Sequence, residues 1–300
     1  PVFLGLKGFM RFKRIAKDFD VLHFHYPYPF ADILAIMVNK PYLITYHSDI
    51  VKQKYLEFFY SPLRYLFLKG ASYIVATSPN YLKTSHVLHK FNDKCSIIPI
   101  GVNVDHYSSK NACGVFFKDL PDKFVLFVGA VRYYKGLNIL VEALRGTNIN
   151  LVIAGAGSME QRLFDLVRKY QMTNVVFLGK VSERQKMSLL DKCYLFVFPS
   201  HLRSEAFGVS LLEAAAMRRA LVSCEIGTGT TYVNINNVTG EVVRPSDHEE
   251  LRAVLLDLWV NPEKVRFYGQ NARKRVERFF TETRVFESYK QLYKKLSEHR

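Results

Sequence analysis

Two glutamates eight positions apart, Glu205 and Glu213, are the residues of this chain best suited to do chemistry. They lie in the stretch SEAFGVSLLEAAA, which follows an apolar run typical of a buried strand. Gly208 and the Ala-rich run after it predict a turn and then a helix. A helix N-terminus favours an anionic ligand, and carboxylates accept hydrogen bonds from sugar hydroxyls. The pattern predicts a nucleotide-sugar site; the alternative is two carboxylates that only stabilise the helix dipole.

A second candidate pair, Arg132 and Lys135, occurs in the stretch FVLFVGAVRYYKGL. The stretch predicts a strand ending at Gly129, a short loop with the two cations, and a helix that begins after Gly136. Arginine and lysine at the carboxyl end of a strand, beside a helix N-terminus, would suit a diphosphate. Taken alone, the two residues could equally be surface charge.

These residues must be positioned by an α/β framework, because short β-rich runs alternate with longer segments of helical spacing. Near-continuous apolar strands joined by helices indicate parallel sheets covered on both faces. The polar stretch 105–123 is the predicted join between two such sheets. The predicted strands are 21–25, 42–47, 72–78, 96–100, 124–129, 150–155, 175–179, 194–199 and 220–225.

The length of 300 residues allows two domains, each with its own core. We expect a first Rossmann-like domain at 1–118, a second at 119–275, and a final helix at 276–300 that crosses back to the first. A doubly wound half usually opens with strand, glycine turn and helix. Here a basic helical segment leads directly into the strand at Val21, which predicts a first domain truncated at its N-terminus.

Several motifs in order along the chain resemble the retaining glycosyltransferases of family four, the glycosyl transferases group 1 of bacterial polysaccharide and lipopolysaccharide synthesis. The resemblance covers nearly the whole chain and implies the GT-B fold, two facing Rossmann-like domains. The segments that carry it are DVLHFHYPYP, KPYLITYHSD, IIPIGVNVDHY, FVGAVRYYKGL, LVIAGAGSMEQRL, VVFLGKVS, SEAFGVSLLEAAA and the tail from RPSDHEELRAV to VERFF.

The resemblance implies a role for each part of the glutamate stretch. Glu205 would accept hydrogen bonds from hydroxyls of the transferred sugar, and Glu213 would hold the nucleotide ribose. The backbone N–H groups of Phe207, Gly208 and Val209 would cap the phosphate or the sugar from the helix start.

The resemblance also implies that Arg132 and Lys135 neutralise the diphosphate as the glycosidic bond breaks. His47, at the end of a first-domain strand, would face the donor sugar. One departure concerns the arginine: the family more often places it directly after the glycine, where this chain has Ala130.

We therefore expect a metal-independent, retaining hexosyltransferase that needs no cofactor. Its donor would be a nucleoside diphosphate hexose, with mannose favoured. Its acceptor would be a lipid-linked glycan in cell-surface polysaccharide synthesis. Two alternatives stay open. One is a sugar-nucleotide epimerase of the same fold, which needs acid/base carboxylates on both sides of its cleft. The other is a non-catalytic nucleotide-sugar-binding partner.

The net charge of +15 concerns the partners of this chain. Residues 1–118 carry 15 Lys and Arg against 7 Asp and Glu. Nucleic acid, an anionic membrane surface and phosphorylated substrates all fit a basic protein, as does a solvated surface without a function. The sequence shows no nucleic-acid-binding module, so we expect no nucleic-acid partner. The aromatic and basic segment 52–70 is either an interfacial helix on anionic lipid or a helix packed on the first sheet.

Cysteine usage and hydropathy bear on the compartment. The cysteines show neither metal nor redox spacing, so we expect reduced thiols. No apolar run approaches the roughly 20 residues that span a bilayer, and no secretory signal is visible at the start. We therefore expect a cytoplasmic protein with a peripheral contact on the inner face of the membrane. The cysteines are Cys95, Cys113, Cys193 and Cys224.

Overall fold

The computed structural model describes residues 6–38, 40–50, 54–112, 117 and 120–298, without the side chains of 6–7 and 54–57. The chain forms two compact units, 1–99 with 283–300, and 100–282. The predicted boundary at 118–119 lies outside the described residues, as does Cys113. The structure divides the chain earlier, between Pro99 and Ile100, and again after Glu282 rather than at 275.

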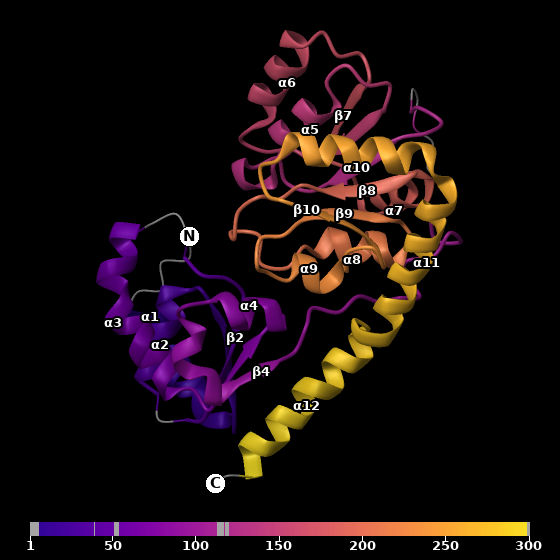
Figure 1. The fold of residues 1–300 in the computed structure, drawn as a ribbon. Helices are drawn as coiled ribbons and strands as arrows, with labels where there is room; N and C mark the ends of the chain where they lie inside the picture. The colour runs from indigo at the N-terminus through magenta and orange to yellow at the C-terminus, as the bar shows by residue number, and fades with distance from the viewer. Residues whose placement is uncertain (1–5, 39, 51–53, 113–116, 118–119, 299–300) are drawn as a thin grey trace. The chain divides into compact units, whose positions relative to one another are not determined.

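The first unit contains a four-stranded sheet in the order β1-β2-β3-β4, and all its neighbouring strands are parallel (Figure 1). Parallel strands require crossover connections, which the helices of this unit supply. The strands are β1 Leu22–Tyr26, β2 Tyr42–Tyr46, β3 Tyr73–Ala76 and β4 Cys95–Ile97. The helices are α1 Leu6–Ile15, η1 Ala16–Asp18, α2 Pro29–Ile36, α3 Lys54–Gly70, α4 Pro79–Thr84, η2 Leu88–Lys94 and α12 Glu282–Glu298.

The two faces of this sheet are covered by different parts of the chain. Successive strand side chains point to opposite faces. On one face Phe24 packs edge-on against the rings of Tyr42 and Phe67, so α3 covers that face. On the other, a core of strand residues is completed by α12 near the end of the chain. The buried members of that core are Leu43, Val75, Ile98, Leu292 and Leu296.

The second unit contains a six-stranded parallel sheet in the order β10-β9-β8-β5-β6-β7. Its strand order reverses between β5 and β8, because the chain runs outward from β5 through β6 to β7 and then returns to start β8 on the other side of β5. Ligands of open α/β sheets bind at the carboxyl ends of the strands at such a switch point. The strands are β5 Val125–Val128, β6 Leu151–Ala154, β7 Val175–Gly179, β8 Leu195–Phe198, β9 Leu221–Cys224 and β10 Gly240–Val243.

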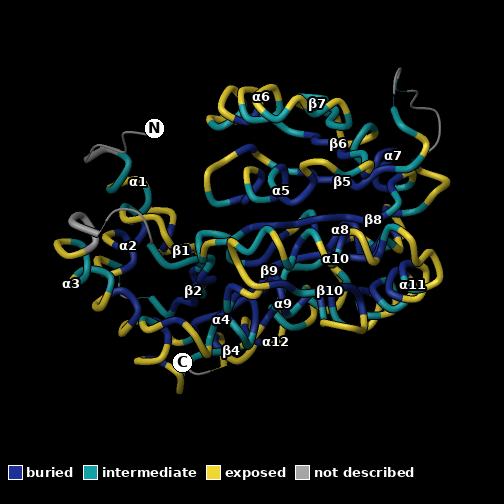
Figure 2. Tube along the Cα trace, turned by 45° about the horizontal axis from the view of Figure 1, so that its top comes forward, coloured by how far each residue is buried: buried dark blue, intermediate teal, exposed yellow. Residues whose placement is uncertain are grey.

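Helices cover both faces of the second sheet. One apolar core joins α7, α8 and part of α11 to the sheet, and a second joins α5, α6, α10 and the start of α11 to the opposite face. Figure 2 shows most of the strands as buried, the edge strand β7 as intermediate, and the outer sides of these helices as exposed. The helices are η3 Tyr133–Lys135, α5 Leu137–Leu144, α6 Glu160–Lys169, α7 Glu183–Lys192, α8 Val209–Ala216, α9 Thr230–Val233, α10 His248–Val260 and α11 Pro262–Phe279.

All nine predicted apolar runs contain strands, most of them shorter than the runs. The sequence prediction missed β10, a short edge strand that contains a glutamate. Among the described residues, no helix is long and apolar enough to cross a membrane. The described cysteines Cys95, Cys193 and Cys224 are free thiols, and burial raises the pKa of Cys193 and of Cys224 to about 12.

Candidate active site

Two loops meet at the switch point of the second sheet. The loop after β5 leads into η3 and ends in Lys135, and the loop after β8 carries Glu205. Because β5 and β8 are adjacent and parallel, both loops leave the same edge of the sheet. The sequence-predicted cation and carboxylate therefore come from neighbouring strand ends.

Gly136 brings these two loops into direct contact. It adopts φ +69°, a left-handed conformation that favours glycine. A Cβ atom here would lie 2.0 Å from the carbonyl oxygen of Pro199, so only glycine allows the approach. A backbone hydrogen bond from the His201 N–H to the Tyr134 carbonyl, 3.0 Å long, fixes the contact. The loop that carries Lys135 is thus held against the loop that carries Glu205.

Lys135 and Glu205 form an ion pair. The Lys135 Nζ lies 2.5 Å from Glu205 Oε2, and the Ser200 hydroxyl donates to the same oxygen at 3.1 Å. The two side chains are only 11% and 12% exposed. The ammonium also lies 4.5 Å from the centre of the Phe198 ring. The pair therefore presents one fixed cation and one fixed carboxylate at a single, largely desolvated position.

The start of α8 lies directly after Glu205. Gly208 is the N-cap residue with φ +92°, and its neighbour Phe207 is buried edge-on against Phe280. The first N–H groups of a helix lack intrahelical acceptors, so those around Val209 can donate to an anion or a sugar oxygen. The predicted segment Phe207, Gly208 and Val209 therefore forms the start of a helix, as the sequence indicates.

Glu213 lies one turn further along α8 and is buried. Its Oε1 accepts hydrogen bonds from the Tyr107 hydroxyl at 2.8 Å and from Lys186 Nζ at 2.7 Å. Burial alone would lower the pKa of Lys186, but Glu213 and then Glu183 outweigh it and raise that pKa. Both hydrogen bonds use Oε1, so Oε2 of Glu213 accepts no hydrogen bond from the described residues.

Sequence reasoning missed Tyr107 and Lys186 as partners of Glu213. Tyr107 lies far away in the sequence, and Lys186 lies on α7 among other surface charges. Ser182 begins α7 with a capping box, and this motif indicates a helix in the sequence. The motif does not indicate which way the Lys186 side chain points.

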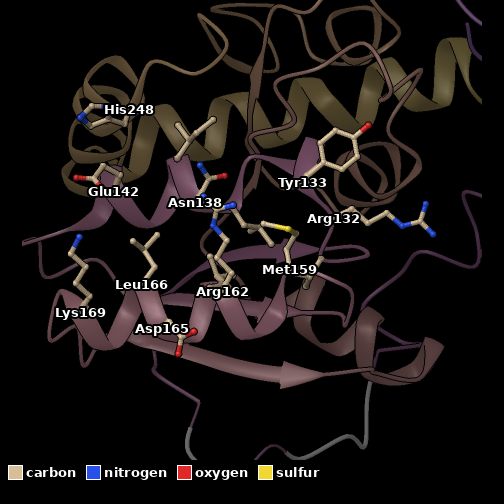
Figure 3. Close-up of a pocket in the computed structure, with 14 residues that line it drawn as sticks. Arg132, Tyr133, Asn138, Glu142, Met159, Arg162, Asp165, Leu166, Lys169 and His248 are labelled. Atoms are coloured by element: carbon tan, nitrogen blue, oxygen red, sulfur yellow. The ribbon is translucent and has the colours of Figure 1, made fainter. Parts of the chain in front are cut away.

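Arg132 takes a different position from Lys135. It is exposed and lines a cavity of about 430 Å³ between α5 and α6, which neither Lys135 nor the two glutamates line. In Figure 3 its guanidinium points away from the other labelled residues of that cavity. Arg132 meets Lys135 through the backbone, where the Lys135 N–H donates to the Arg132 carbonyl at 3.1 Å. The structure brings Lys135 and Glu205 together but does not join Arg132 to them.

His47 belongs to the first unit, where it follows β2. Its Nε2 lies 2.8 Å from Nδ1 of His25, and the two rings are stacked. Burial, and then the charge of His25, lowers the pKa of His47, so the ring is neutral at neutral pH. Among the described residues, no cluster of three or more histidine, cysteine, aspartate or glutamate side chains could hold a metal ion.

Comparison with protein families decides the assignment. The model of glycosyl transferases group 1 matches residues 114–275, and that of glycosyltransferase family 4 matches residues 3–106. This chain belongs to the glycosyl transferases group 1 family. The family match confirms the sequence resemblance and makes the chain a glycosyltransferase.

Two relatives of this glycosyltransferase are 43% identical to it over the aligned residues. One is the O-antigen chain mannosyltransferase C of Escherichia coli, aligned over 98% of this chain and 80% of the relative. The other is the D-rhamnosyltransferase WbpZ of Pseudomonas aeruginosa, aligned over 92% of this chain and 74% of the relative.

Solved structures share the fold of this glycosyltransferase. A sucrose-phosphate synthase from Thermosynechococcus elongatus superposes with a TM-score of 0.81 at 21% identity, over 98% of this chain and 78% of the other. Anabaena HepE in complex with UDP and glucose gives 0.80 at 17% identity, over 98% and 84%. With its two parallel-sheet α/β units, the chain has the predicted GT-B class of fold.

Proposed function

We propose that this glycosyltransferase moves a hexose, with mannose favoured, from a nucleoside diphosphate sugar to a glycan acceptor in cell-surface polysaccharide synthesis. The names of the two relatives at 43% identity support the substrate class. The observation that carries the proposal is the Lys135–Glu205 pair beside the start of α8. A donor there would meet a cation for its diphosphate, a carboxylate for its sugar hydroxyls and free amide donors.

We further propose that the reaction retains the anomeric configuration and needs no metal ion. Departure of the leaving group places negative charge on the diphosphate, and a fixed ammonium stabilises that charge as it grows. Lys135 can act this way, with Arg132 as a second cation should its side chain turn toward the donor. Glu205 is held by Lys135 and Ser200, which suits a sugar-binding carboxylate better than a covalent nucleophile.

The donor is tested by thermal denaturation against a panel of nucleotide sugars. A ligand present at 100 times its Kd adds about 2.7 kcal/mol of stability. We expect GDP-mannose to give the largest shift, and no shift with any nucleotide sugar would refute the proposed site. Activity in excess EDTA tests the metal requirement. NMR of the product tests retention, since an inverted linkage would contradict it.

We also propose a peripheral contact with anionic membrane, which would suit a lipid-linked acceptor. On α3, Phe58 and Phe59 are 75% and 80% exposed, and Tyr65 and Leu66 are exposed beside Lys69. Aromatic rings favour the headgroup region, and cations are attracted to anionic lipid. In Figure 1, α1, α2 and α3 lie together, and α2 packs against the other two. The exposed cations of α1 are Arg11, Lys13 and Arg14.

Co-sedimentation with liposomes tests this contact. The double variant Phe58→Ala/Phe59→Ala should lose binding to vesicles that contain anionic lipid. The matched control is Phe286→Ala, which removes a ring that is 64% exposed on α12. Equal binding of the wild type to neutral and anionic vesicles, or unchanged binding by the double variant, would exclude this surface.

A further inference from the structure

Three imidazole rings form a row on one face of the first sheet. His23 and His25 alternate with buried residues along β1, and His47 directly follows β2. The strands pair so that His25 lies opposite Thr45, and the His47 N–H donates to the Tyr26 carbonyl at 3.0 Å. The rings stack with centres 4.7 Å apart between His23 and His25, and 5.1 Å between His25 and His47.

The row is anchored at the His23 end by α12. His23 Nδ1 lies 2.7 Å from the Tyr293 hydroxyl, and its Nε2 lies 2.7 Å from Thr45 Oγ1. Thr45 Oγ1 in turn lies 2.8 Å from the Tyr289 hydroxyl. Both ring nitrogens of His23 are therefore occupied, which fixes its rotation. Two tyrosines one turn apart on α12 hold this end of the row.

At the other end, His25 and His47 share a hydrogen bond of 2.8 Å between His25 Nδ1 and His47 Nε2. A neutral imidazole offers one donor and one acceptor, so this bond requires that one ring donates and the other accepts. It thereby couples the tautomers of the two rings. Among the described residues, Nδ1 of His47 has no hydrogen-bond partner, so it is the nitrogen of that ring available to a ligand.

We propose that His25 is a positioning residue that sets the ring orientation and tautomer of His47, and that Tyr289 and Tyr293 hold the row from α12. The inference rests on the proposed function, to which we add that His47 faces the donor sugar, as the sequence resemblance implies. A ring free to rotate would present either nitrogen, or a C–H edge, to the substrate. The hydrogen bond to His25 selects one ring orientation before the substrate binds. The reaction then does not bear the entropic cost of orienting the ring.

The surroundings favour the neutral forms of His23 and His47. Burial, and then the charges of His25 and His47, lowers the pKa of His23 to about 4. The groups that face the row are the hydroxyls of Thr45, Tyr289 and Tyr293, none of which is charged at neutral pH. When acid protonates both His25 and His47, each facing nitrogen becomes a donor and their hydrogen bond is lost.

Two substitutions at one position separate positioning from packing. His25→Asn keeps a hydrogen-bonding atom near the place of Nδ1, whereas His25→Phe keeps the ring and removes the bond. We expect His25→Phe to lower kcat about 100-fold, the cost of a misplaced catalytic group. His25→Asn should recover most of that loss. The matched control is His86→Phe, an exposed histidine of the same unit, which should leave the rate unchanged.

The pH profile supplies a readout that a packing role would not move. His25 lowers the pKa of His47 by charge repulsion, so His25→Asn should raise that pKa. The acid limb of kcat/KM, where neutral His47 is lost, should then move to higher pH. An unmoved acid limb, or equal rates for His25→Asn and His25→Phe, would overturn the inference.

The variant His47→Ala distinguishes this inference from the proposed function. If His47→Ala transfers sugar at the wild-type rate, the role of His47 in the proposed function fails. If His47→Ala is inactive while His25→Phe is fully active, only the positioning role fails. Circular dichroism and thermal denaturation without ligand serve as the folding check for every variant, because the substituted residues lie in the first unit.

Discussion

Replacing Lys135 by alanine should slow sugar transfer about 10²–10³-fold, which equals about 2.7–4 kcal/mol of transition-state stabilisation. The reason is that Lys135 is the fixed cation of the site, with a side chain 11% exposed and 2.5 Å from Glu205. The same change leaves a mostly buried carboxylate with only Ser200 as its partner. Breaking a buried pair costs about 3–5 kcal/mol of folding stability, so the variant should also unfold at a lower temperature.

A second substitution separates these two effects. In Lys135→Ala/Glu205→Gln the uncompensated charge is gone, so stability should return while the rate stays low. Initial rates of transfer from GDP-mannose give kcat and KM, and thermal denaturation gives Tm. Lys192→Ala, which removes an exposed lysine of α7, is the matched control. The reasoning is refuted if Lys135→Ala keeps the wild-type rate, or if the double variant regains it.

Three more predictions follow from described contacts. Glu213→Gln should raise the KM for the donor about 10- to 100-fold, because a charged hydrogen bond contributes about 1.5–3 kcal/mol; an unchanged KM would exclude ribose binding by Glu213. Gly136→Ala should lower both the Tm and the rate, since its Cβ would meet the Pro199 carbonyl. The control is Gly146→Ala, at φ +68° with open space around it, which should cost only the backbone strain of about 1–2 kcal/mol. Burial raises the pKa of Asp32 to about 6, so the folded state holds this proton more tightly than the unfolded state, and the free energy of unfolding should fall as pH rises from about 4 to about 6. Urea denaturation at several pH values should show that Asp32→Asn removes up to about 3 kcal/mol of this pH dependence. An equal change of the free energy of unfolding with pH in variant and wild type would contradict the prediction.

The sequence predicted the framework well where burial alone determines an element. Nine apolar runs became strands because parallel strands covered on both faces are apolar throughout. The edge strand β10 was missed because Glu241 interrupts its apolar pattern. The structure shows how that carboxylate is tolerated: it accepts from the Tyr268 hydroxyl at 2.7 Å and pairs with Lys264 at 2.7 Å, both on α11. Such partners, distant in sequence, are not visible from local pattern.

The candidate site also contains features that the local sequence pattern predicts and features that it does not. Lys135 and Glu205 could be predicted to meet, because each follows an apolar strand and parallel strands present their ends at one edge. The orientation of Arg132 could not, since a flexible surface side chain leaves no trace in local pattern. The pairing of His25 with His47 depends on the register of β1 against β2, which the sequence does not specify.

The core of the first unit has a consequence for synthesis. Leu43, Val75 and Ile98 are translated early, but Leu292 and Leu296, which cover them, are made only after the whole second unit. In a nascent chain on the ribosome, this apolar face of the sheet therefore stays exposed until residues 283–298 emerge. Premature termination after residue 282 would leave a folded donor unit attached to a first unit with an open, aggregation-prone face.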